Sequence, residues 1–185
     1  MHNLIKQFKA SPTIPVLTLN DPQKAPAIAE ALLKKGLSNL EITLRTPHAI
    51  ACIEAIIKYF PEATVGAGTI TRTEQFAMVK AVGCHFAVSP GFTTEMVDAA
   101  KKAAIPYLPG ISTPSEIMAL SSLGITFQKF FHAGNAGGVK MLKAYGALFP
   151  DILFCPTGGI TAEDYQNYLA LENVLCVGGS WMAEG

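Results

Sequence analysis

Short apolar segments alternate with longer segments of helical periodicity along the whole chain. The short segments are rich in β-branched and aromatic residues, and several end at a glycine or a proline. This composition is typical of parallel strands that are buried on both faces. The pattern predicts eight strands, over residues 13–19, 40–44, 63–68, 86–89, 107–109, 126–131, 152–156 and 174–178.

Signals for the start of a helix follow these strands. Asp21, Thr46 and Thr113 each precede a proline, so a capping side chain stands before a residue suited to the first helical turn. We expect helices to begin near residues 21, 46, 71, 93, 113, 136 and 161, and a further helix over 3–9 to precede the first strand. Capping-box spacing occurs in three pairs, which are Thr71 with Glu74, Thr113 with Glu116, and Thr161 with Asp164.

The repeated strand–helix unit predicts an α/β fold, with a (β/α)₈ barrel as the first choice and a doubly wound open sheet as the second. The repeat carries no leucine-rich or other consensus that would favour a solenoid. No Gly/Ser-rich linker or shift of composition divides the sequence. A single domain over residues 1–185 is therefore expected.

Composition and charge narrow the classes of partner. Half of the 185 residues are hydrophobic and 15% are charged, which excludes an intrinsically disordered chain. The 14 Lys and Arg residues balance the 14 Asp and Glu residues, so nothing favours binding to nucleic acid or to an anionic membrane surface. No apolar run is long enough to span a bilayer, and the N-terminus lacks the features of a signal peptide. A cytoplasmic protein is expected.

The cysteines and histidines carry no metal or disulfide motif. Cys52, Cys84, Cys155 and Cys176 form no CxxC pair, and each lies in an apolar stretch where a buried thiol is the ordinary explanation. The four histidines show no HxH or HxxxH spacing. We therefore expect no metal, no disulfide framework and no cofactor.

One lysine stands apart from the others. Lys129 lies within the sixth predicted strand between aromatic neighbours, whereas the other lysines lie on predicted helices or near the N-terminus. A rim lysine whose ammonium reaches water is the alternative interpretation, but a closed parallel barrel has no edge. Burial favours the neutral amine, which is the form that attacks a carbonyl group. Lys129 is therefore the candidate nucleophile.

The second predicted strand carries charged residues on one face. Glu41, Thr43 and Arg45 alternate with leucine and isoleucine, so the three share a side of the strand. A structural Glu–Arg pair at a strand end would explain them equally well if they stood alone. With Lys129 they form a chemical set, in which the carboxylate moves protons and the guanidinium binds a substrate carboxylate.

Glycines close several other strands. Thr69 follows a glycine-rich third strand, and the pairs Gly158-Gly159 and Gly178-Gly179 follow the last two strands. Barrels bind phosphate through backbone N–H groups at that position, although each pair alone could be an ordinary tight turn.

These segments together resemble the 2-keto-3-deoxy-6-phosphogluconate (KDPG) and 4-hydroxy-2-oxoglutarate (KHG) aldolase family. The resemblance runs in order through Glu41–Arg45, Gly66–Thr69, Ser89-Pro90-Gly91, Pro109-Gly110, Lys129-Phe130-Phe131, Pro156–Ile160 and Gly178–Trp181, and covers nearly the whole chain from Ile14. It implies a class I aldolase with a (β/α)₈ fold that releases pyruvate and glyceraldehyde 3-phosphate from KDPG, or pyruvate and glyoxylate from KHG. It also implies a homotrimer that acts in the Entner–Doudoroff pathway or in glyoxylate metabolism.

The resemblance also implies a role for each residue of the set. Lys129 would form the Schiff base with the 2-keto acid, and Glu41 would be the general acid and base. The pyruvyl part would be held by Arg45, Thr69, Pro90 and Phe131. The substrate hydroxyls would contact Thr157, and the distal phosphate would bind at Gly158, Gly159, Gly179 and Ser180.

The sequence departs from the family pattern just after the lysine. The family continues Lys-Phe-Phe-Pro-Ala-Glu, whereas this chain has His132 and Gly134 in place of the proline and the glutamate. We consider two functional hypotheses beside a tolerated loop change: a more mobile loop, or a histidine that assists proton transfer or binds a carboxylate or phosphate. Only four residues follow Trp181, so the final helix of the family is expected to be missing from this chain.

Two other functions remain open from the residues alone. A phosphate-binding isomerase or epimerase could use the same glycine pairs with Glu41 as its base. It would not need Lys129 as a nucleophile, and barrels of that kind often use metal ligands. A barrel that has kept only a ligand-binding pocket is the non-enzymatic alternative, although it would not be expected to keep Glu41, Arg45, Thr69 and Lys129 together.

Overall fold

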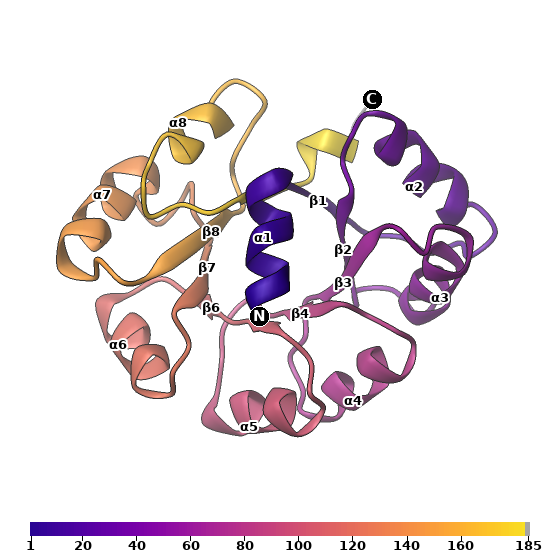
Figure 1. The fold of residues 1–185 in the computed structure, drawn as a ribbon, viewed down its shortest axis with the longest axis horizontal. Helices are drawn as coiled ribbons and strands as arrows, with labels where there is room; N and C mark the ends of the chain where they lie inside the picture. The colour runs from indigo at the N-terminus through magenta and orange to yellow at the C-terminus, as the bar shows by residue number, and fades with distance from the viewer. Residues whose placement is uncertain (184–185) are drawn as a thin grey trace.

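Parallel strands and helices alternate along residues 1–183, the part of the chain that the computed structural model describes (Figure 1). The strands within that range are β1 (Thr13–Leu17), β2 (Asn39–Thr43), β3 (Thr64–Gly68), β4 (Phe86–Val88), β5 (Tyr107–Leu108), β6 (Gly110–Ile111), β7 (Phe127–Phe131), β8 (Leu153–Thr157) and β9 (Val177–Gly179). The helices are α1 (His2–Ala10), α2 (Ala25–Lys34), α3 (Ala49–Tyr59), α4 (Glu74–Ala81), α5 (Thr94–Lys102), α6 (Pro114–Ser122), α7 (Gly138–Leu148) and α8 (Tyr165–Leu169), followed by the 3₁₀ helix η1 (Trp181–Ala183).

The sheet closes into a barrel at a proline. Its strand order is β5-β4-β3-β2-β1-β9-β8-β7-β6, so the two end strands are consecutive in the chain and only Pro109 separates them. Proline has no N–H to donate to a strand ladder. Its carbonyl accepts from the N–H of Lys129 at 2.8 Å, so β5 and β6 together occupy one position of the barrel. The (β/α)₈ prediction is confirmed, with the fifth predicted strand divided in two.

The last strand is shorter than the sequence pattern indicated. It begins at Val177 rather than at residue 174, and Val174 forms only an isolated bridge with Phe154. The N–H of Val174 donates to the carbonyl of Leu171, which closes a turn after α8. That bond holds Val174 in the turn, so regular pairing with β1 begins only at Val177.

Several helices begin two to four residues later than expected, and at three of them the expected capping residues make other bonds or close a turn ahead of the helix. Thr46 donates its hydroxyl to the carbonyl of Leu19 and does not cap α3. The N–H groups of Thr71 and Arg72 donate to the side chain of Gln75, and the expected box with Glu74 does not form. The pair Thr161 and Asp164 does bond, but it closes a turn ahead of α8.

Helix α1 covers the N-terminal end of the barrel, where it crosses the middle of the view in Figure 1. Its Phe8 is fully buried and packs edge-to-face on Phe86 of β4 at 5.3 Å between ring centroids, and on Phe127 of β7 at 6.0 Å. These rings belong to an interior cluster with Ile14 and Leu108. The lower half of the barrel is therefore a solid apolar core.

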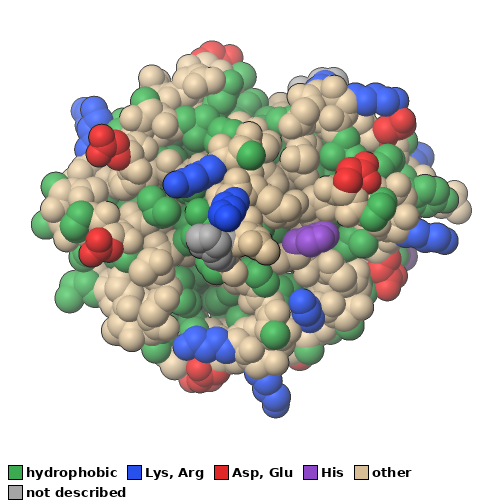
Figure 2. All heavy atoms as spheres, viewed as in Figure 1, with side chains coloured by type: hydrophobic (Ala, Val, Ile, Leu, Met, Phe, Trp, Pro, Cys, Tyr) green, Lys and Arg blue, Asp and Glu red, His purple; other side chains and the backbone are tan. Residues whose placement is uncertain are grey.

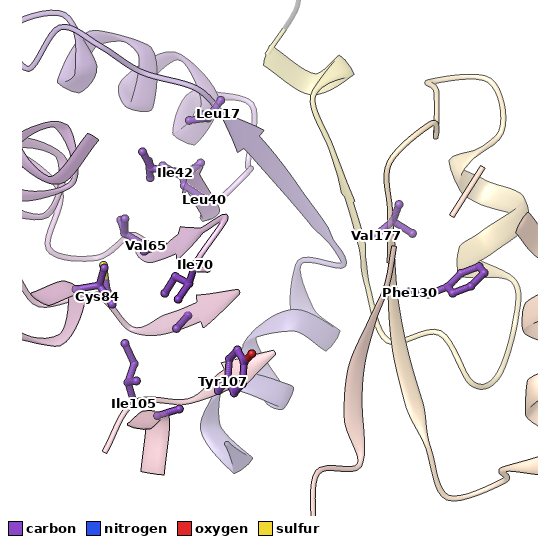
Figure 3. Close-up of a cluster of buried hydrophobic side chains, with 14 of the residues drawn as sticks. Leu17, Leu40, Ile42, Val65, Ile70, Cys84, Ile105, Tyr107, Phe130 and Val177 are labelled. Atoms are coloured by element: carbon purple, nitrogen blue, oxygen red, sulfur yellow. The ribbon is translucent and has the colours of Figure 1, made fainter. Parts of the chain in front are cut away.

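A second and larger apolar cluster lies between the outer face of the sheet and the surrounding helices. Figure 3 shows part of it, with Leu17, Leu40, Ile42 and Val65 close together on the first three strands and Phe130 farther round the sheet. The residues that point outward on each strand supply this cluster, which is why the strands read as nearly continuous apolar runs.

The surface facing the viewer in Figure 2 is the end of the barrel that α1 crosses. Lys, Arg, Asp and Glu side chains are interspersed there with apolar ones.

Across residues 1–183, no helix combines the length and apolar character needed to cross a membrane. All four cysteines are buried and unpaired, as the sequence predicted.

Candidate functional site

A buried ion pair lies inside the upper half of the barrel. Nζ of Lys129 on β7 lies 3.4 Å from Oε1 of Glu41 on β2, and both side chains are about 95% buried. The strands β2 and β7 stand four places apart in the sheet order, so the two side chains meet across the lumen. Removing one member of such a pair would leave an uncompensated charge in a poorly solvated interior.

The inner face of β7 changes from apolar to reactive along its length. Phe127 belongs to the core under the site, Lys129 follows at mid-height, and Phe131 stands at the upper end, because alternate residues of a strand share a face. The Phe131 ring lies 5.2 Å from the lysine nitrogen, measured to the ring centroid. An aromatic wall therefore shields the amine from bulk water.

Two buried thiols lie close to the ion pair. Cys155 is the partner of Lys129 in the register of β7 and β8. A hydrogen bond with the Cys176 thiol lowers the pKa of Cys155; burial opposes that shift, and the positive charge of Lys129 adds to it. Burial raises the pKa of Cys176, which stays a neutral thiol.

Glycine makes room for the carboxylate of Glu41. A Cβ atom on Gly68 of β3 would lie 2.0 Å from Oε1 of Glu41, far inside van der Waals contact. Gly68 therefore has a packing role in the site as well as a role in the turn that follows.

Arg45 lies above this pair at the end of β2. Its Nε donates to Oγ1 of Thr69 at 3.0 Å, which joins the loops after β2 and β3. Thr69 has a φ of +58°, a left-handed conformation that is unfavourable for a β-branched residue. Local strain of this kind is often found where a side chain must be aimed at a ligand.

The turn after β8 presents backbone donors. Gly158 and Gly159 both have positive φ, of 92° and 70°. Within residues 1–183, no protein atom accepts a hydrogen bond from the N–H groups of Gly159, Ile160 or Ser180. Unpaired N–H groups in consecutive positions form a ready binding site for an anion.

These features surround one cavity of about 390 Å³. It is lined by residues from the ends of β1, β2, β7, β8 and β9: Val16, Glu41, Arg45, Lys129, Phe131, His132, Thr157, Gly158, Gly159, Ile160, Gly179 and Ser180. Among these residues, Glu41 is the only acid, and it is paired with Lys129. The cavity is therefore suited to an anionic ligand.

Comparison with models of known protein families shows the family to which the chain belongs. The model of the KDPG and KHG aldolase family matches residues 4–185. The chain belongs to this family.

Individual members of the family are close to this chain in sequence and structure. The 2-dehydro-3-deoxy-phosphogluconate aldolase of Pseudoalteromonas atlantica is 49% identical, over 95% of this chain and 82% of its own length. The KHG/KDPG aldolase of Escherichia coli strain K12 is 47% identical, over 92% of this chain and 80% of its own. The crystal structure of the KDPG aldolase from Legionella pneumophila superposes with a TM-score of 0.91 at 48% identity, over 94% of this chain and 84% of that one.

Most of the residues that the family resemblance selected lie at the cavity. The structure brings together Glu41, Arg45, Lys129, Phe131, Thr157, Gly158, Gly159, Gly179 and Ser180. Thr69 is not among the lining residues and reaches the site through Arg45. Pro90 lies at the exposed rim, outside the lining, and its carbonyl packs where a Cβ on Gly110 would stand. The roles of all these residues remain predictions.

Some residues of the site were not selected from the sequence. Val16 and Ile160 line the cavity, and Cys155 and Cys176 lie near the lysine. The alternation of β1 indicates that Val16 faces inward, and its register with Glu41 places it in the same layer. The two cysteines carry no comparable signal, because a buried thiol is common in any apolar strand. In the described chain, no group of three or more His, Cys, Asp or Glu side chains could hold a metal ion.

Proposed function

We propose that this chain is a class I aldolase that cleaves KDPG, and KHG as a second substrate, with Lys129 as the Schiff-base residue. The observation that carries the proposal is the buried contact between the Lys129 amine and the Glu41 carboxylate at the C-terminal side of the barrel. Catalytic groups of (β/α)₈ enzymes are found at this side. Family membership supports the same reaction.

Lys129 and Glu41 together can make the proton transfers that imine formation and C3–C4 cleavage require. Transfer of a proton from Lys129 to Glu41 frees the amine to attack the C2 ketone, and the resulting carbinolamine loses water when the carboxyl group returns the proton to its hydroxyl. The protonated imine then accepts the electron pair of the C3–C4 bond as that bond breaks. Glu41 removes the C4 hydroxyl proton, which releases the aldehyde and leaves an enamine.

The pyruvyl half is completed by protonation of the enamine at C3 and hydrolysis of the imine. Glu41 is the acid for the first step and the base for the second, because it is the carboxylate in contact with Lys129. A related enzyme supports this path, since the aldolase of Legionella pneumophila has been captured with pyruvate as a covalent carbinolamine.

The remaining residues position the substrate. Arg45 and Thr69 hold the carboxylate of the keto acid, and the Phe131 ring packs against the carbon that becomes the methyl group of pyruvate. Pro90 stiffens the rim on the same side. Thr157 contacts the substrate hydroxyls, while Gly158, Gly159, Gly179 and Ser180 bind the distal phosphate. The free N–H groups of the turn and the hydroxyl of Ser180 support this placement.

The same proposal extends to assembly. We propose a homotrimer, which rests on the family resemblance alone. Light scattering of the purified protein would then give three times the chain mass of 19.6 kDa.

The cleavage reaction tests the proposed function. Pyruvate release from KDPG, followed with a coupled dehydrogenase, should be readily measured for the parent protein. Glu41→Gln should reduce kcat by about 10²- to 10⁴-fold, the usual contribution of a general acid–base group. Lys129→Met should leave no measurable rate. An isomerase or epimerase would consume the substrate without releasing pyruvate, and a binding module would leave it unchanged.

A further inference from the structure

We propose that His132 is a specificity-determining residue that binds the distal phosphate of the substrate through its imidazole ring. The inference rests on the proposed aldolase function, and it assigns a selective role to a side chain that takes no part in Schiff-base chemistry. Three observations carry the argument: the position of the ring at the turn after β8, the free donors around it, and the geometry of the cavity mouth.

The imidazole ring stacks on the Gly158 backbone. A Cβ atom built on Gly158 would lie 2.9 to 3.0 Å from three ring atoms, Cγ, Cδ2 and Nδ1, so the face of the ring covers that position. The ring is also tilted against Phe131, at 5.0 Å between centroids and 54° between planes. His132 therefore stands between the aromatic wall beside Lys129 and the glycine turn.

The loop that carries His132 is tied to this turn. The N–H of Ala133 donates to the carbonyl of Thr157, and the N–H of Gly134 donates to that of Gly158, each at 2.9 Å. The His132 carbonyl itself accepts from the N–H groups of Asn135 and Ala136 at 3.0 Å. The imidazole is thus positioned before a ligand arrives, which reduces the entropy cost of binding.

The ring adds a donor to a set of unpaired backbone donors. Across residues 1–183, neither ring nitrogen of His132 has a hydrogen-bond partner in the protein, and the N–H groups of Gly159 and Ile160 are also free. A neutral imidazole carries one N–H and a protonated one carries two, so the ring can donate in either state. A phosphate, with several acceptor oxygens, matches such a cluster.

The cavity has two separate places for negative charge. Arg45 follows β2, whereas His132 follows β7, and these strands are four places apart in the barrel. A keto acid anchored by its carboxylate at Arg45 and by its ketone at Lys129 would extend its far end toward the turn after β8. The phosphate of KDPG reaches that end, and the shorter KHG carries no group at the same distance.

The test measures the preference for a phosphorylated acceptor. The parent, His132→Ala and His132→Gln are compared in the addition of pyruvate to glyceraldehyde 3-phosphate and to glyceraldehyde, with His48→Ala as the control for an exposed histidine outside the cavity. His132→Ala should raise the KM for glyceraldehyde 3-phosphate about tenfold, the effect of losing one hydrogen bond to a charged group. The kcat for both aldehydes and the KM for glyceraldehyde should change less than about twofold.

The other variants sharpen the result. His132→Gln, which keeps an N–H donor, should raise the KM for the phosphorylated aldehyde less than alanine does, and His48→Ala should match the parent. A His132→Ala protein with an unchanged preference for the phosphorylated aldehyde would overturn the proposal, and so would an equal loss with both aldehydes.

A second measurement separates this inference from the proposed function. Binding of inorganic phosphate, measured by calorimetry, requires no catalysis, and His132→Ala should weaken it about tenfold. If the parent protein shows no aldolase activity, a tenfold loss of phosphate binding still supports the role of His132. Equal phosphate affinity in the parent and in His132→Ala contradicts it.

Discussion

Gly68 places a strict steric limit on the Glu41 carboxylate. The space that a side chain at position 68 would fill is taken by the Glu41 carboxylate, which approaches Lys129 from the neighbouring strand. Because both charged side chains are almost fully buried, the carboxylate has little room to move aside. The distance between acid and amine therefore depends on a residue that takes no part in the chemistry.

Substitution of Gly68 by alanine should damage catalysis more than stability. The added methyl group would displace the Glu41 carboxylate, and a shift of about 1 Å in a catalytic group can reduce kcat by about a hundredfold. Overpacking should lower the free energy of unfolding by about 1–3 kcal/mol. The measurements are kcat for pyruvate release and unfolding by urea.

Gly91→Ala is the matched control for this substitution. No heavy atom lies within 4 Å of a Cβ built on Gly91, so both kcat and stability should stay close to those of the parent. An unchanged kcat in Gly68→Ala would show that the carboxylate can retreat without cost, contrary to the steric argument.

His132 and Gly134, the two residues that depart from the family pattern after Lys129, are coupled through the backbone. A Cβ on Gly134 would lie 2.8 Å from the carbonyl oxygen of Gly159, so a larger residue there would push the glycine turn away. The two residues are separated by only Ala133, whose N–H bonds to Thr157. Gly134 thus allows the loop to approach the turn closely enough for the His132 ring to stack on Gly158.

At the scale of elements, the start of α6 links helix capping to the site. Thr113 and Glu116 form the full capping box that the sequence predicted. Oε2 of Glu116 accepts from the N–H of Ser112 at 2.7 Å and from the N–H of Thr113 at 2.8 Å. Ser112 in turn donates its hydroxyl to the carbonyl of Phe131 at the end of β7. The cap therefore supports the strand that carries Lys129.

The capping carboxylate should make stability depend on pH. Desolvation alone would raise the pKa of Glu116, but the hydrogen bonds from Ser112 and Thr113 outweigh it and leave the pKa below its usual value. A lowered pKa in the folded state stabilises the protein above the unfolded pKa of about 4.3, and this stabilisation is lost as the pH falls through the folded value.

Glu116→Gln should therefore lower the free energy of unfolding at pH 7 by about 1 kcal/mol, the typical value of a helix cap. The difference from the parent should shrink as urea unfolding is repeated from pH 7 down to about pH 3.5, because the parent loses its advantage on protonation. Glu54→Gln, on the exposed face of α3, is the control and should differ little at any pH. An equal penalty for Glu116→Gln at both ends of the range would contradict the carboxylate's role.

At the scale of the whole molecule, the sequence predicted the barrel because each strand and helix carries its own local signal. The split at Pro109 and the late start at Val177 were not predicted, since they depend on which strand each backbone group meets. Three helix starts were placed too early. The Thr46 hydroxyl donates to the Leu19 carbonyl on another part of the fold, whereas the N–H of Thr71 donates to the Gln75 side chain and the N–H of Thr161 to the Asp164 carboxylate, which closes local turns before the helices begin.

The site was predictable only in part. Lys129 and Glu41 stand out as charged residues within apolar strands, and such residues need a functional or structural partner. Their contact across the lumen follows from the closure of the barrel, which no local pattern contains. The stacking of His132 on Gly158 likewise depends on the bonds between two loops, and the thiol pair beside Lys129 depends on strand register.

The central claim about the molecule is that Lys129 forms a Schiff base with a 2-keto acid. The apolar core under the site and the aromatic wall beside the amine exclude water, and in the proposed mechanism Glu41 moves the protons. Borohydride reduction in the presence of pyruvate tests this claim most directly, because it makes the imine permanent before hydrolysis can occur.

Peptide mass spectrometry of the reduced protein should locate one pyruvate-derived adduct on Lys129. Lys129→Arg, which keeps the positive charge without the nucleophile, should give none, and His132→Ala should be labelled as the parent is. Labelling at another lysine, or no adduct under conditions in which the folded protein binds pyruvate, would contradict the account.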